Sequence, residues 1–521
     1  MRWPRWSTVL AGLIVIVAAA LRLWQLDSVP LGLHNDEAWT GLNAREVLRD
    51  GWIGPYLYPS GVGQPAGPVY FTALLFTILP QTTFTLRLSM ALFGIAAVGL
   101  TYAAGRTMFD STTALFAAAL LAIMPWHLHL SRTGLMVQAW PCIEMAILWA
   151  LFRARARPTI WKFAGVGLLV GLGIYTYNAY PLFVPLVAVP WLYDLAAARG
   201  RAARRQWIAY AAAAAVTAAW ATALMVDYAA RHDEYFWHHR DVSVFHAQSW
   251  REAGGPERAG ILAARGAEWA QGLFVGGRPD DGDGLGERGH PLLDPFIAAA
   301  AAAGLVMAAR GWRRPAYGVL LAAVLILPCG ALLTTGDGLY RRTFGLAPFL
   351  ALLAALPLAW LWQRARERGG AWRALSAGAI LLCVVAVAVR NAHAYFGPLQ
   401  RSEAIRYVYP YQIDAAVRSA ARLPPDTIVY LYSERWGAGF ETIKWLAPDR
   451  DIVDRSREFR RFGARDDPVD FSADGRRPTA FLLLGNYLGF VTALQTRYPN
   501  AVVTEARSGD EVLYRLVDLR R

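Results

Sequence analysis

The apolar run STVLAGLIVIVAAALRLWQL at residues 7–26 and the polar stretch HNDEAW at residues 34–39 together predict the architecture of this chain. A run of about 20 apolar residues is long enough to cross a lipid bilayer as a helix. No small-residue cleavage site follows it, so we expect a retained first span, not a removed signal peptide. The second stretch then brings two adjacent carboxylates, Asp36 and Glu37, to a membrane surface.

The composition indicates a polytopic membrane protein. Of 521 residues, 55% are hydrophobic and only 17% are charged, whereas a soluble chain carries about 25% charged residues. The net charge of +13 does not indicate nucleic-acid binding, because the arginines occur in short loops between apolar runs, where charge sets membrane orientation. The three cysteines fall in apolar runs without metal-ligand spacing, which predicts small core residues.

The apolar runs predict eleven spans, with every second loop forming an arginine cluster on the cytoplasmic side. The N-terminus is then cytoplasmic, and one outer face carries residues 27–83, 127–135, 227–293 and 336–343 and the tail from residue 392. Residues 68–80 are too short for a span and predict an interfacial or re-entrant helix. The predicted spans are 7–26, 84–105, 112–128, 136–152, 161–176, 181–197, 207–226, 294–309, 316–335, 344–363 and 373–390.

The tail is expected to form a small extracytoplasmic α/β domain. We therefore divide the chain into a membrane-embedded catalytic domain at 1–391 and a soluble domain at 392–521. Residues 402–422 and 487–498 are candidate helices. Alternating or continuous apolar runs predict strands at Ile428–Tyr432, Ala480–Leu484, Ala501–Thr504 and Glu511–Leu516. No catalytic motif is evident in this tail, so packing or acceptor docking is its expected role.

Asp36 and Glu37 are the candidate catalytic residues. Acids in the first turn of a helix are common and need no catalytic role, so that alternative stays open, above all for Glu37. A long loop directly after the first span, with few other paired acids near the membrane, favours a functional role. An acid close to hydrocarbon is costly to ionise, which predicts a raised pKa suited to a general base.

Three arginines on the same face are candidate phosphate ligands: Arg132 after the third span, and Arg341 and Arg342 before the tenth. Guanidinium groups bind phosphate through paired hydrogen bonds and offset the charge of a leaving group. The alternative is that each arginine anchors the chain among lipid headgroups.

The remaining candidates are weaker. His232, His238, His239 and His246 crowd one outer segment, but a polar surface helix explains them better than a metal site. The loop from Gly282 to Arg288, ending at His290, is a candidate lid that brings His290 to the substrate. Gln64 and Tyr177 are candidate substrate contacts, although interfacial aromatic belts also explain the tyrosine. No cofactor is expected from these patterns, and a divalent metal remains an open alternative.

Several segments resemble the GT-C membrane glycosyltransferases, in particular the protein O-mannosyltransferase and aminoarabinose-transferase branch (glycosyltransferase family 39) and the bacterial phospholipid carrier-dependent glycosyltransferases. The resemblance spans roughly residues 20–390. The segments are Arg22–Leu26, Asp36-Glu37 with Ala44–Leu48, Gln64–Tyr70, Leu86–Ser89, His129–Gly134, Arg240–Phe245 and Pro291–Pro295.

The resemblance implies a polyprenyl-phosphate sugar donor and Asp36 as the base that activates the acceptor. Two positions depart from the family pattern. Gln64 stands where a lysine often contacts the lipid phosphate, so Arg132 or Arg341 would have to replace that contact. Gln138 stands where a second acid is often found, which weakens a two-acid or metal-dependent mechanism.

The sequence thus predicts an inverting glycosyltransferase of the bacterial inner membrane, acting on a protein, lipid or cell-wall glycan on the outer face. One base and a single attack would invert the anomeric carbon. The alternative is a non-enzymatic transporter or a flippase for lipid-linked sugars. A transporter is expected to show related halves and charges near the membrane centre, and neither is evident in the sequence.

Overall fold

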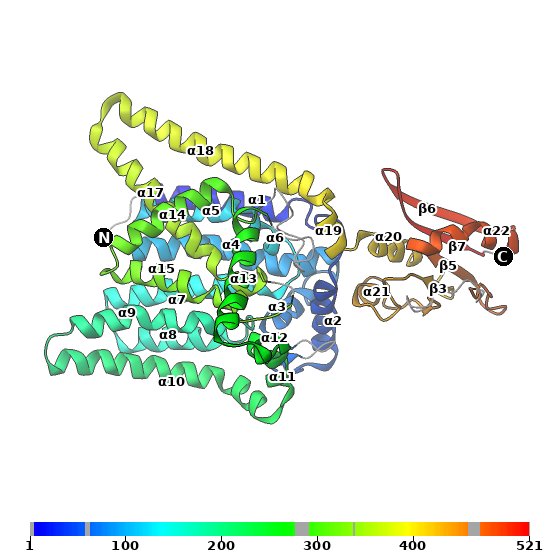
Figure 1. The fold of residues 1–521 in the computed structure, drawn as a ribbon, viewed down its shortest axis with the longest axis horizontal. Helices are drawn as coiled ribbons and strands as arrows, with labels where there is room; N and C mark the ends of the chain where they lie inside the picture. Colours follow the sequence, from blue (N-terminus) through cyan, green and yellow to red (C-terminus); the bar gives the residue numbers. More distant parts are fainter. Residues whose placement is uncertain (1–4, 58–62, 277–290, 337–338, 457–468, 520–521) are drawn as a thin grey trace.

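The structure is a computed structural model that describes residues 5–57, 63–276, 291–336, 339–456 and 469–519, except for the side chains of 237–239. It consists of a bundle of long helices with a small α/β unit at one end (Figure 1). The helices of the bundle are α1 (Arg5–Leu23), α4 (Thr83–Met108), α5 (Ser111–Ile123), α6 (Pro125–Ser131), α7 (Ala139–Ala156), α8 (Ile160–Gly173), α9 (Val184–Ala197), α10 (Arg201–Arg231), α14 (Pro295–Arg310), α15 (Pro315–Ile326), α16 (Cys329–Leu332), α17 (Leu346–Arg368) and α18 (Gly370–Phe396).

Each of the eleven predicted spans overlaps at least one of these helices, and the chain is a multi-pass membrane protein. Within the described residues, seven helices are long and apolar enough to cross a membrane, or eight if α5 and α6 form one span bent by 62°. The bend falls where Pro125 begins α6. Helices α8 and α14, with 14 and 16 residues, are shorter than the about 20 residues that a perpendicular span needs.

The centre of the bundle is formed by α4 and α17, and the periphery by α10 and α18. Of the most apolar stretch of α17, 72% is buried inside the structure, whereas for α18 the share is only 6%. Small residues let the central helices approach closely, as is common in membranes. At Gly304 of α14, for example, an added Cβ would lie only 1.9 Å from the carbonyl oxygen of Leu353 in α17.

Shorter helices and a two-stranded ladder connect the long helices, and one of these helices, α2, begins at the candidate catalytic acids. These segments are α2 (Asn35–Asp50), β1 (Tyr56–Leu57), β2 (Gln64–Pro65), α3 (Gly67–Phe76), α11 (Glu234–Asp241), α12 (Gln248–Glu252) and α13 (Gly255–Phe274). His34 caps α2: its Nδ1 accepts a hydrogen bond from the Asp36 amide, and its own amide donates to Glu37 Oε1. This reciprocal cap fixes where α2 begins. The short α3 covers most of the predicted interfacial segment 68–80 and begins one residue before it.

The C-terminal unit is a five-stranded mixed sheet with strand order β4-β3-β5-β7-β6. Strand β3 is parallel to both of its neighbours, β4 and β5, while β7 is antiparallel to β5 and β6. All four predicted strands are present, but β4 and α21 were not predicted. The elements are α19 (Glu403–Val408), α20 (Tyr411–Ala420), β3 (Ile428–Tyr432), α21 (Glu441–Leu446), β4 (Ile452–Asp454), β5 (Thr479–Leu483), α22 (Val491–Arg497), β6 (Val502–Ser508) and β7 (Glu511–Asp518).

Helix α21 joins this unit to the bundle by inserting Trp445 against α2. The indole is 3% exposed and stacks on Phe76 of α3 at 5.8 Å between ring centroids. The guanidinium carbon of Arg45 lies 3.8 Å from the ring centroid. At Gly41, a Cβ would come within 2.7 Å of the indole, so only glycine leaves room for it. The C-terminal unit therefore supports the helix that begins at the candidate acids.

We expect Trp445→Ala to destabilise the protein by about 3–5 kcal/mol, because the truncation leaves a cavity beneath α2. Thermal unfolding of the purified protein in detergent measures the loss. The matched control is Trp161→Ala, since Trp161 is 82% exposed and should lose little stability. Equal unfolding temperatures for the two variants would contradict this role of Trp445.

Candidate active site

Asp36 lies at the start of α2 and pairs with an arginine more than 300 positions later in the chain. Arg341 Nη1 donates to Asp36 Oδ2 at 2.7 Å, and His34 Nδ1 lies 3.9 Å from the same oxygen. Arg341 belongs to a short 3-10 turn, Arg341–Thr343, just before α17. The Asp36 side chain keeps 33% of its surface exposed and Arg341 keeps 18%. The pair is therefore ordered by its contacts yet open to a ligand.

The charge environment of Asp36 differs from the one expected. Partial burial favours the neutral acid, but the combined effect of His34 and Arg341 outweighs burial and holds the pKa of Asp36 below its ordinary value. The prediction of a raised pKa was therefore wrong. It considered the cost of a charge near hydrocarbon but not the cation that the fold brings from a distant loop. Asp36 is a carboxylate at neutral pH.

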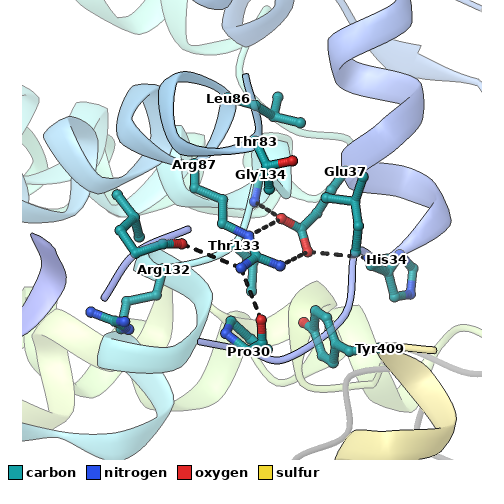
Figure 2. Close-up of polar contacts among 12 residues, drawn as sticks. Pro30, His34, Glu37, Thr83, Leu86, Arg87, Arg132, Thr133, Gly134 and Tyr409 are labelled. Atoms are coloured by element: carbon teal, nitrogen blue, oxygen red, sulfur yellow. Dashed lines mark hydrogen bonds and ion pairs between the residues drawn. The ribbon is translucent and has the colours of Figure 1, made fainter. Parts of the chain in front are cut away.

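Glu37 has a different environment although it is the next residue. It is fully buried, and its carboxylate accepts hydrogen bonds from Arg87 Nε at 2.8 Å, the Gly134 amide at 2.8 Å and the His34 amide at 3.3 Å (Figure 2). Arg87 in turn donates to the carbonyl oxygens of Pro30 and Gly32. Such a buried and saturated ion pair is typical of a structural role, so we leave Glu37 out of the proposed catalytic groups.

Arg132 is also fully buried, and its guanidinium binds backbone carbonyl oxygens. Its guanidinium donates to five carbonyl oxygens at and beyond the end of α1, those of Leu21, Arg22, Trp24, Gln25 and Val29. This arrangement caps the C-terminus of α1 and leaves no exposed surface for a phosphate. We therefore remove Arg132 from the proposed phosphate ligands.

Arg342 and Arg341 are adjacent but face different partners. Arg342 Nη1 donates to Thr334 Oγ1 at 2.8 Å and to the Thr335 carbonyl at 2.6 Å. These contacts brace the turn that carries Arg341. Of the three predicted arginines, Arg341 is thus the one that the fold brings to Asp36.

The other predicted contacts lie in several places. Gln64 pairs with Leu57 in the two-stranded β1–β2 ladder, and Tyr177 stacks on Trp140 with centroids 5.8 Å apart. Gln138 is buried between His127 and Ser131, so it belongs to a polar network inside the bundle. His290 and the candidate lid Gly282–Arg288 lie outside the described residues.

The histidine-rich segment does not form a metal site in the part of the chain that the structure describes, where no group of three or more His, Cys, Asp or Glu side chains could hold a metal ion. His232 Nδ1 donates to the backbone carbonyl oxygen of Tyr228, and the two rings stack with centroids 4.0 Å apart. The side chains of His238 and His239 are not described.

Two groups at this end were missed as site residues. Arg87 forms the ion pair that holds Glu37 in place. In the sequence, only its position in the motif Leu86–Ser89 could have pointed to it. Tyr409 comes from the C-terminal tail; its hydroxyl lies 3.1 Å from His129 Nε2 and its ring 5.6 Å from that of His34. Contacts between positions so far apart leave no signal in a single sequence.

We expect Glu37→Gln and Asp36→Asn to differ in stability. Glu37→Gln leaves the buried Arg87 cation without its counter-charge, a change that costs about 3–5 kcal/mol. Asp36→Asn alters a partly exposed pair and should cost about 1 kcal/mol or less. Thermal unfolding of both variants measures the difference. A larger loss for Asp36→Asn would reverse the two assignments.

Comparison with known proteins adds a family match and structural matches. Residues 63–225 match the family model described as dolichyl-phosphate-mannose-protein mannosyltransferase. This match covers a minority of the chain and includes helices α3 to α9. No curated protein matches the chain.

The solved structures extend the likeness to the whole chain. The crystal structure of ArnT from Cupriavidus metallidurans bound to undecaprenyl phosphate matches with a TM-score of 0.53 and 14% identity, over 99% of this chain and 98% of that one. The Archaeoglobus fulgidus oligosaccharyltransferase, tethered to an acceptor peptide, matches with a TM-score of 0.54 and 14% identity. This match covers 86% of the present chain but only 64% of the archaeal chain. The expected resemblance is confirmed: the chain has the GT-C fold of these membrane glycosyltransferases.

Proposed function

We propose that this protein is an inverting glycosyltransferase that moves a sugar from a polyprenyl-phosphate donor to an acceptor on the outer face of a bacterial inner membrane. The observation that carries the proposal is the partly exposed Asp36 carboxylate held by Arg341 at the start of α2. It supplies an anionic base and a guanidinium within one hydrogen bond of each other. The acceptor is a protein, lipid or cell-wall glycan.

The chemistry follows from these two groups. The acceptor oxygen attacks the anomeric carbon, the bond from that carbon to the phosphate oxygen breaks, and polyprenyl phosphate leaves with the electron pair. Asp36 receives the proton of the attacking group. The phosphate needs no proton to leave, because a cation such as Arg341 offsets its charge. A single displacement inverts the configuration of the sugar.

Arg341 also links donor binding to the strength of the base. In the pair, the cation stabilises the Asp36 carboxylate and makes it a weak proton acceptor. A donor phosphate that shares the guanidinium weakens that stabilisation and raises the proton affinity of Asp36. Asp36 then becomes an effective base when the donor is in place, which limits the attack of other nucleophiles on an incomplete complex.

The comparisons support the class of donor and leave the sugar and acceptor to experiment. ArnT is bound to undecaprenyl phosphate, and the archaeal oligosaccharyltransferase is in complex with dolichol phosphate and an inhibitory peptide in a second structure. We carry the lipid-phosphate donor to this chain because the match to ArnT extends over nearly the full length of both chains.

Asp36→Asn should lower sugar transfer by about 10²–10⁴-fold, the usual contribution of a general base, while the binding of polyprenyl phosphate is retained. Transfer is measured with radiolabelled polyprenyl-phosphate sugars and membranes from a deletion strain as the source of acceptor. Arg49→Gln is the control, because Arg49 pairs with Asp50 at the exposed far end of α2. Full transfer by Asp36→Asn would exclude Asp36 as the base. Movement of donor across vesicles without transfer would favour a flippase.

Arg341→Gln should move the acid limb of the pH–rate profile to higher pH. Transfer requires the Asp36 carboxylate, and Arg341 helps to lower the pKa of that group. Loss of the cation raises the pKa, so protonation and loss of rate begin at a higher pH. The profile is normalised to each variant's own maximum, which separates this shift from lost phosphate binding. An acid limb unchanged from that of the wild type would show that Arg341 does not tune the base.

A further inference from the structure

A polar cavity of about 550 Å³ lies at the opposite end of the bundle from Asp36. It is enclosed by the α4–α5 turn, the end of α7, α14, the start of α15 and α17. Helix α4 runs from Thr83, beside the C-terminal unit, to Met108, beside the cavity. Its 26 residues correspond to about 39 Å at 1.5 Å per residue. The cavity and the candidate active site are therefore separated by the thickness of a membrane.

The charges around the cavity favour an anion. Arg155 binds the carboxylate of Asp194 through Nε and Nη2, and its Nη1 makes no hydrogen bond among the described residues. Arg314 is exposed and has no side-chain hydrogen bond or ion pair among the described residues. The acid on the cavity wall, Asp110, caps the start of α5. Its two carboxylate oxygens accept hydrogen bonds from the amides of Thr112 and Thr113 and from the Thr113 hydroxyl.

The other walls fit a ligand that is part polar and part apolar. Gln363 adds an exposed amide at the mouth. Phe109 and Tyr317 pack against each other at 5.4 Å between centroids, and Met307 and Leu356 form apolar lining. Aromatic rings beside arginines are typical of the level of a bilayer at which phosphate groups lie. A basic pocket between helix ends is a common form of lipid-headgroup site.

We infer that this cavity binds the phosphate headgroup of an anionic phospholipid in the leaflet opposite the candidate active site. Arg314 and Nη1 of Arg155 bind the phosphate oxygens, and the side-chain amide of Gln363 donates a hydrogen bond to the headgroup. The apolar wall takes the start of the acyl chains. The inference does not depend on the proposed transfer reaction, because it uses none of the residues near Asp36.

Native mass spectrometry of the delipidated full-length protein tests the inference by titration with phosphatidylglycerol or phosphatidylcholine. Wild type should retain phosphatidylglycerol in preference to phosphatidylcholine. Arg314→Gln should weaken phosphatidylglycerol binding about fivefold, and Gln363→Glu should weaken it further by placing an anion at the mouth. Arg314 makes no side-chain cap on α15, so its replacement should not affect folding.

Arg313→Gln is the matched control, because it removes the same charge from the next residue, whose guanidinium lies over Trp312 and does not line the cavity. The inference is overturned if both arginine variants weaken binding equally, since the effect would then be general surface charge. Equal retention of both lipids by wild type would also overturn it. Displacement of phosphatidylglycerol by millimolar glycerol 3-phosphate, at the same Arg314 dependence, would assign the cavity to a soluble phosphate instead.

Discussion

The buried ion pair between Arg87 and Glu37 is the constraint on which the rest of this end of the molecule depends. Both side chains are almost completely buried, and an isolated charge there would be very costly. Each charge is therefore balanced by the other, and Arg87 also holds the carbonyl oxygens of Pro30 and Gly32. The loop before α2 is fixed by this pair, and the loop in turn fixes where Asp36 points.

The two neighbouring acids thus have different roles: Glu37 contributes to stability, and Asp36 is the candidate for chemistry. Glu37 is saturated with donors and orders the loop, whereas Asp36 keeps a third of its surface exposed and shares a cation. One residue of helix turns the side chain by about 100°, which is enough to move a carboxylate from the core to the site. The two roles could be exchanged only if the hydrogen-bond donors around both positions also changed.

The sequence was sufficient to predict the helical membrane architecture and the strands of the tail, because long apolar runs and short alternating runs are local signals. It also predicted Asp36 and Arg341 as candidates, but not that they meet. Their pairing depends on where the fold places the turn Arg341–Thr343 that precedes α17, and no local pattern records this. Arg132 shows the converse limit: an arginine at the end of a span can bind phosphate or cap a helix, and only the fold distinguishes the carbonyl oxygens that surround it.

The order of the chain has a consequence for biosynthesis. The candidate base Asp36 leaves the ribosome long before Arg341 and long before the Trp445 that supports α2. A partly synthesised chain therefore has the acid but neither the cation nor the support. The candidate site therefore gains its cation and its support only after α21 has been made.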